Sequence, residues 1–219
     1  MKKAEVNDVK KMILILQSNL GLEYTVLQQQ DEDNSIHVYK KIKDELSQEV
    51  YLELKMNDVK NEYRLFLVQK GKKFEKATFE NKLDSICGLG IYAESVLGDY
   101  TRDHKTQNEI LNLEKNQLDL LNQILKLKVG EKYYSISIEK KGLINLEKLN
   151  NGSFNVYYLS IDENKIILVE NREAPSAFLV IYNFSLKLKR FHDLCAKWKN
   201  DVNLNLITEE KIKRLYLGK

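Results

Sequence analysis

The chain has 219 residues, a formal net charge of +3, and 43% apolar and 31% charged residues. These proportions are typical of a globular chain and argue against wholesale disorder. Apolar runs such as residues 12–16 are far shorter than the ~18–20 residues of a membrane span, so we expect no membrane association. A polar stretch follows the first lysines, so we expect no secretory signal.

The first half of the chain predicts a helix, four strands and a second helix. Helical spacing of 3 and 4 residues runs through Val6, Val9, Ile13, Leu16 and Leu20. Gly21 follows where a C-terminal cap belongs. Runs of β-forming residues lie at 24–27, 36–39, 50–55 and 63–68, the last two joined as a hairpin. The closing helix is indicated by Phe79, Leu83, Ile86, Cys87 and Ile91.

The second half repeats this order. Thr106 and Glu109 fit a capping box that opens one helix reaching Lys128. Its apolar face steps through Ile110, Leu113, Gln117, Leu120, Ile124 and Leu127. Gly130 follows, and then β-type runs at 133–138, 143–146, 156–159 and 166–169. A closing helix carries Leu188, Phe191, Cys195 and Trp198, and residues 202–207 and 208–217 predict a further strand and a short basic helix.

We therefore predict an α+β fold of two tandem α-β-β-β-β-α units, at residues 1–103 and 104–219. In each unit an antiparallel sheet is packed by helices, and the shared order predicts an internal duplication. The helix at residues 106–128 also has leucines beside its apolar face, at 111, 118, 121 and 125. It is either a core helix of the second unit, which we favour, or a short coiled coil that pairs two copies.

One predicted strand resembles the E-x-K element of the PD-(D/E)xK nucleases, because Glu53 and Lys55 share one of its faces. In that family two acidic residues hold Mg²⁺ and a lysine supports the attacking water, so the resemblance implies a Mg-dependent nuclease. The second acid would be Asp31, Asp33 or Asp44. The resemblance covers only these few residues. The strand also fits an amphipathic pattern in which Glu53 and Lys55 face water, and we favour that interpretation.

No other motif predicts chemistry. The histidines, His37, His104 and His192, are far apart and lack metal-ligand spacing. Cys87 and Cys195 are the only cysteines, which favours a reducing, cytoplasmic compartment and buried thiols over a disulfide framework. Phosphate-loop, dinucleotide-binding and nucleophile-elbow patterns do not occur. We therefore predict no catalytic residues, no metal and no cofactor.

The clearest surface signal is basic and lies near the C-terminus. It consists of Lys187, Lys189, Arg190, Lys197, Lys199, Lys211, Lys213 and Arg214. These residues are candidates for contact with nucleic acid or with an acidic protein. The alternative, which we favour, is a solvated lysine face on two helices.

These observations predict a non-enzymatic, protein-binding accessory factor of a bacterium or phage. Inhibitor, immunity, anti-defence and chaperone-like proteins are the types we consider, as a monomer or homodimer. Mixed-charge helices and exposed strand edges suit protein binding. The alternative is a nucleic-acid-binding protein that uses the basic C-terminal helices. A lesser alternative is the Mg-dependent nuclease centred on Glu53 and Lys55.

Overall fold

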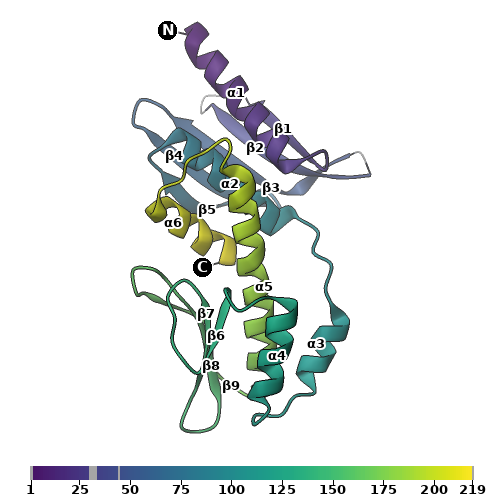
Figure 1. Ribbon diagram of the computed structural model, residues 1–219. Helices are drawn as coiled ribbons and strands as arrows, with labels where there is room; N and C mark the ends of the chain where they lie inside the picture. The colour runs from purple at the N-terminus through teal and green to yellow at the C-terminus, as the bar shows by residue number, and fades with distance from the viewer. Residues whose placement is uncertain (1, 30–33, 44, 219) are drawn as a thin grey trace. The chain divides into compact units, whose positions relative to one another are not determined.

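The computed structural model describes residues 2–29, 34–43 and 45–218 and shows an α+β protein, as predicted (Figure 1). By compactness the chain divides into two units, Met1–Asp99 together with Leu194–Gly218, and Tyr100–Asp193. The division predicted from the sequence, near residue 103, placed Leu194–Gly218 in the second unit, whereas by compactness this segment groups with the first unit. None of the helices in the described ranges is both long and apolar enough to cross a bilayer.

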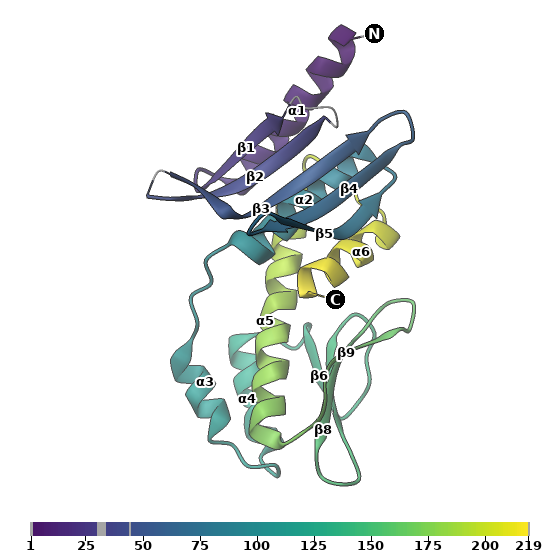
Figure 2. The same cartoon turned by 180° about the vertical axis from the view of Figure 1, so that it is seen from behind.

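The first unit is a five-stranded antiparallel sheet whose strand order, β1-β2-β3-β4-β5, follows the chain. Helices α1 and α2 cover one face, and Figure 2 looks onto the opposite face. Its elements are α1 (Lys2–Leu20), β1 (Tyr24–Gln29), β2 (Ser35–Ile42), β3 (Glu45–Asn57), β4 (Glu62–Gln69), β5 (Lys72–Phe79), α2 (Lys82–Leu97) and α6 (Leu206–Leu217).

The core of the first unit lies between the sheet and its helices. Ile36, Leu52 and Leu54 of the central strands are fully buried there, together with Leu16 of α1. These residues alternate with outward-facing ones along β2 and β3, which is why one face of each strand is apolar. The predicted glycine cap of α1 is confirmed, since Gly21 has φ +87° and its N–H bonds the Gln17 carbonyl at 3.1 Å.

Two glycines of α2 make room for aromatic rings, one from the C-terminal segment and one from β5. A Cβ on Gly90 would lie 2.1 Å from the ring of Trp198, and one on Gly88 would lie 2.5 Å from Phe79. The glycines therefore do not break α2. They remove side chains where two aromatic rings press against the helix, which allows closer packing than any larger residue would. Trp198 is buried in this contact.

The second unit is a four-stranded sheet in the order β6-β7-β8-β9. Its elements are α3 (His104–Leu111), α4 (Leu118–Lys128), β6 (Tyr134–Ile136), β7 (Ile144–Lys148), β8 (Phe154–Leu159), β9 (Lys165–Arg172) and α5 (Ala174–Trp198), and α5 continues past the boundary of the unit. Strands β6 and β7 run parallel, so this sheet is mixed, whereas we predicted two antiparallel sheets. The Asn145 side chain braces the short connection by accepting from the Lys140 N–H at 2.8 Å.

Three local predictions are wrong. The helix predicted at residues 106–128 is two helices, and Asp103, not Thr106, caps the first by accepting from the Thr106 N–H. Residues 202–207 are not a strand, because α6 begins at Leu206. Phe79 ends the unpredicted strand β5 and does not belong to a helix. In each case a local capping or edge-strand geometry overrides the hydrophobic period that the prediction used.

Candidate functional site

The face of the first sheet that points away from α1 and α2 is called the open face (Figure 2). Side chains directly opposite each other on antiparallel strands share a face, so the register assigns its members. They include Ser35, His37 and Tyr39 of β2, Tyr51, Glu53 and Lys55 of β3, Arg64, Phe66 and Val68 of β4, and Lys73, Glu75 and Thr78 of β5. The predicted pair Glu53 and Lys55 therefore does lie on one face.

Glu53 is 2% exposed, although the favoured interpretation of the sequence placed it in water. Its carboxylate lies 2.9 Å (Oε1) and 2.7 Å (Oε2) from the Lys73 ammonium. Oε1 is also 4.0 Å from Nε2 of His37, its opposite residue on β2. A carboxylate can stay ionised out of water only with such partners. Glu53 is buried, contrary to that interpretation, because neighbouring side chains on the open face close over it.

His37 connects this ion pair to two tyrosines. Its Nδ1 lies 2.9 Å from the Tyr39 hydroxyl, and its Nε2 lies 3.1 Å from the Ser35 hydroxyl. The Tyr51 ring lies 5.2 Å from the His37 ring and stacks on Tyr39 at 4.8 Å between centroids. Burial, followed by the nearby Tyr51 and Glu53, raises the pKa of Tyr39 above its ordinary value. We call His37, Tyr39, Tyr51, Glu53 and Lys73 the open-face cluster.

The open-face cluster does not have the arrangement of a hydrolase triad. Ser35 contacts His37, but the other ring nitrogen faces the Tyr39 hydroxyl, where a triad has a carboxylate. Ser35 is also buried, so a substrate has no access to its hydroxyl. The open-face cluster can therefore hold and orient other groups by hydrogen bonds and charge.

The nuclease resemblance receives no support from the described geometry. Both oxygens of Glu53 lie against Lys73. In residues 2–29, 34–43 and 45–218, no group of three His, Cys, Asp or Glu side chains is placed to hold a metal ion. The candidate second acids, Asp31, Asp33 and Asp44, lie outside the described residues.

Around the open-face cluster, apolar and charged side chains stay accessible. Leu27 of β1, which is opposite His37, is 37% exposed, and Phe66, which is opposite Glu53, is half-buried. The side chains of Arg64 and Lys73 are close to half-exposed at the rim. An aromatic and aliphatic centre with a charged rim is the composition typical of protein interfaces.

The basic residues predicted as contacts are divided between the two units. Lys187, Lys189 and Arg190 belong to the second unit, and the remaining members to the first. In the second unit the Arg190 guanidinium lies 4.5 Å from the centroid of the Tyr100 ring. Burial lowers the pKa of Lys187. Neither residue is a fully solvated cation.

Most of the basic residues in the first unit bond within that unit. Lys213 is buried and lies 3.1 Å from Glu210, and Nε of Arg214 lies 3.6 Å from the same carboxylate. Lys197 and Lys211 donate to the carbonyls of Asn19 and Thr78. Lys199 is exposed. Lys197 and Lys211 nevertheless stay exposed like Lys199, so of these five basic residues in the first unit only Lys213 is buried.

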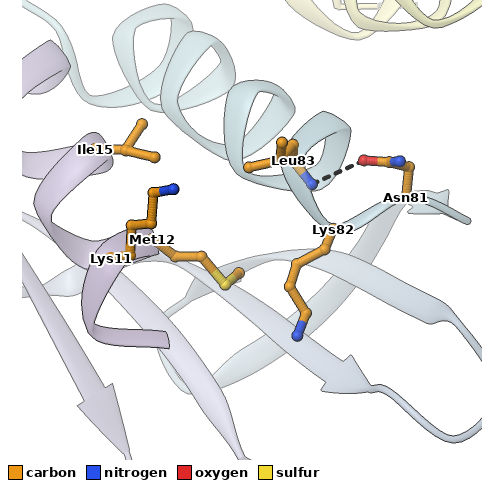
Figure 3. A pocket seen from close by; sticks show the side chains of 6 residues that line it. All are labelled: Lys11, Met12, Ile15, Asn81, Lys82 and Leu83. Atoms are coloured by element: carbon orange, nitrogen blue, oxygen red, sulfur yellow. Dashed lines mark hydrogen bonds between the residues drawn. The ribbon is translucent and has the colours of Figure 1, made fainter. Parts of the chain in front are cut away.

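A groove in the first unit lies between α1 and the start of α2 (Figure 3). Its volume is about 260 Å³, and its walls are Lys11, Met12, Ile15, Asn81, Lys82 and Leu83. Asn81 caps α2 by accepting from the Leu83 N–H at 2.9 Å, and Lys82 pairs with Asp58 at 3.0 Å. The groove is smaller than the ~300–1,000 Å³ usual for small-molecule sites, so it suits a single side chain better than a substrate.

Comparisons of the chain with protein families, with curated proteins and with solved structures find no match. The class that the structure defines is an α+β protein of two compact units. A fold class alone does not imply an activity, so the chemistry of the open face is the basis for a functional proposal.

Proposed function

We propose that the chain is a non-enzymatic, protein-binding accessory factor whose partner binds the open face of the first sheet. The observation that carries this proposal is the open-face cluster, in which Lys73 holds a buried Glu53 carboxylate beneath partly exposed apolar and aromatic side chains. A buried ion pair adds little stability by itself, so its presence on a sheet face points to a role in specificity.

The charges of the open face favour a protein over a nucleic acid as the partner. Lys73 is compensated by Glu53, and Arg64 by Glu62 at 2.8 Å. Phosphate binding draws its affinity from lysines and arginines that are not already neutralised. Tyr39 is buried, and Tyr51 stacks one face of its ring on Tyr39, so the pair offers little ring surface for bases to stack on. A mixed-charge surface with an apolar centre suits a protein surface of similar composition.

We also propose that the chain is one of four types of bacterial or phage protein. An inhibitor, immunity protein, anti-defence factor or chaperone of a bacterium or phage acts by contacting another protein, and the open face serves any of them. A cytoplasmic location is supported by the two buried thiols, Cys87 and Cys195, which suit a reducing compartment.

The experiment is capture of partners by the tagged full chain from a bacterial lysate, with and without nuclease treatment, followed by titration of the captured protein. Phe66→Ala tests the open face. Phe74→Ala is the matched control, because Phe74 pairs with Leu67 and therefore lies on the opposite face. We expect Phe66→Ala to weaken binding about 10-fold or more, as truncation of an interface aromatic often does, and Phe74→Ala to bind as the wild type.

Two outcomes would contradict the proposal. If both variants bind the partner like the wild type, the open face is not the interface. If nuclease treatment removes every captured protein and the chain binds nucleic acid directly, the nucleic-acid alternative is correct. Divalent-metal-dependent cleavage that Glu53→Gln abolishes would instead favour the nuclease.

A further inference from the structure

The turn between β7 and β8, at residues 149–153, contains an asparagine followed by a glycine. This pair, Asn151 and Gly152, occurs nowhere else in the sequence. The Gly152 N–H donates to the Leu149 carbonyl at 3.0 Å, and the Leu149 N–H donates to the Ser153 carbonyl at 2.9 Å. Gly152 has φ +83°, which is the left-handed conformation common in hairpin loops of this kind. The Asn151 side chain is exposed to water in this turn.

An asparagine that precedes a glycine loses its side-chain nitrogen without an enzyme. The backbone nitrogen of Gly152 gives its proton to hydroxide and attacks Cγ of Asn151, and Nδ2 takes up a proton and leaves as ammonia. The product is a five-membered cyclic imide. Water then opens the ring at the side-chain carbonyl to give aspartate, or at the backbone carbonyl to give isoaspartate. The net change is the addition of water and the loss of ammonia. Glycine favours the attack because it has no Cβ to crowd its nitrogen.

We propose that Asn151 is a site of spontaneous deamidation whose rate is set by how often the turn at residues 149–153 opens. In the closed turn the Gly152 N–H is bonded to the Leu149 carbonyl. The Asn151 carboxamide is likewise held by hydrogen bonds of its own. Because the attack requires both groups to leave these partners, the reaction proceeds from the open turn. This inference concerns the second unit and does not rest on the proposed function of the open face.

Ser153 and Asn171 hold the Asn151 carboxamide in the closed turn. The Oδ1 atom of Asn151 accepts from the Ser153 N–H at 3.0 Å, and its Nδ2 donates to Oδ1 of Asn171 at 2.9 Å. The Ser153 hydroxyl lies 2.6 Å from both of these side-chain oxygens and donates to one of them at a time. Each such bond at the surface favours the closed turn by a factor of about 5.

Deamidation favours the open turn. An aspartate at position 151 has no N–H to donate to Asn171, and its carboxylate would face the Oδ1 atom of that residue. An isoaspartate lengthens the main chain by one methylene inside a loop that backbone bonds between Leu149, Gly152 and Ser153 close. We therefore expect the amide hydrogens of this turn to exchange faster with solvent in the modified chain than in the unmodified one.

The experiment compares the full chain at neutral pH with the same chain in urea. Digestion and mass spectrometry follow each asparagine, since deamidation adds about 1 Da, and chromatography separates the two products. We expect Asn151 to react before any other asparagine, and roughly 10- to 100-fold more slowly in the folded chain than in urea.

Ser153→Ala tests the bonds that hold the turn, and Ser153→Thr, which keeps the hydroxyl, is the matched control. We expect Ser153→Ala to reduce the ratio of the rate in urea to the rate in the folded chain about 5-fold, and Ser153→Thr to leave it unchanged. Asn171→Gly is a second test, because it removes the other partner and suits the φ of +49° at that position. It should change the ratio in the same direction. Circular dichroism checks that each variant folds.

Four results would overturn the proposal. The first is an Asn151 that reacts more than about 100-fold more slowly in the folded chain than in urea, which would mean that opening of the turn does not expose it. The second is the same rate in both conditions, since the turn would then not restrain the reaction. The third is a ratio that neither Ser153→Ala nor Asn171→Gly changes in the folded chain. The fourth is another asparagine of the folded chain that reacts as fast as Asn151.

Discussion

His37 and Glu53 lie opposite each other in the register of β2 and β3, with 4.0 Å between Nε2 and Oε1. Lys73 reaches the same carboxylate from β5, so partners from two other strands hold a charge that water does not reach. The Lys73 side chain is itself 47% exposed. A partner that covers it would strengthen its attraction to Glu53 and would also remove water from the ammonium, so binding would be sensitive to this pair.

The first prediction concerns Lys73. We expect Lys73→Met to lower the free energy of unfolding by roughly 1–3 kcal/mol, because it leaves the Glu53 carboxylate buried without its ammonium partner. Glu53→Gln should cost less, since it removes the charge and keeps hydrogen-bonding atoms. The double variant should cost less than the sum of the two. Urea denaturation measures all three. A loss of less than ~0.5 kcal/mol for Lys73→Met would show that Lys73 does not stabilise the carboxylate.

A second prediction concerns the contact between Gly90 and Trp198. In an ordinary helix Gly→Ala stabilises by up to ~1 kcal/mol. Gly90→Ala should instead destabilise by about 1–3 kcal/mol or more, because its Cβ would lie 2.1 Å from the Trp198 ring. Thermal unfolding of Gly90→Ala, of Trp198→Leu and of the double variant checks this. If the smaller leucine side chain in Trp198→Leu fails to relieve any of the Gly90→Ala loss, the ring contact is not its cause.

The alternation of residues was enough to predict most of the first sheet. Val50, Leu52 and Leu54 face the helices, and Glu53 and Lys55 share the other face, as the period of two requires. The sequence could not predict that Glu53 stands opposite His37, because the alternation of residues has the same period of two in every register of β2 against β3. Two runs on these strands, Ser-x-His-x-Tyr and Tyr-x-Glu-x-Lys, were the available signal, since each puts its named residues on one face.

The second unit was harder to predict for a different physical reason. The leucines of α4 fit two overlapping helical stripes, and only packing against the rest of the unit decides that Leu121 and Leu125 are buried and Leu127 is not. Likewise, strand alternation is the same for parallel and antiparallel neighbours, so the parallel pairing of β6 and β7 had no sequence signature. Tertiary packing overrides local pattern at both places.

A third prediction concerns the thiols. Burial raises the pKa of Cys87 far above its ordinary value and raises that of Cys195 to about 12. Since the thiolate is the reactive form, both side chains should react with a disulfide reagent at pH 8 at least ~100-fold more slowly in the folded chain than in urea. Spectrophotometric titration of thiols measures the two rates. A thiol that reacts equally fast in both conditions would show that its surroundings open readily.

The last prediction concerns the pH dependence of the cap on α3. The Thr106 N–H, followed by the Thr106 hydroxyl at 2.7 Å, lowers the pKa of Asp103 to about 2. An unfolded aspartate titrates near ~3.9, so the charged cap stabilises the fold above that pH. The contribution is lost as the pH falls towards 2, because the folded state then binds the proton that the unfolded state already holds.

Asp103→Asn keeps an acceptor at the cap and removes the charge. Its stability difference from the wild type should be constant near neutral pH and shrink as the pH falls from about 4 to about 2. Thr106→Val separates the two donors: the pKa of Asp103 should rise but stay below its ordinary value, because the backbone N–H of residue 106 remains. Carboxyl NMR titration measures both pKa values. A wild-type Asp103 that titrates at an ordinary pKa would mean that these two bonds do not hold the cap in solution.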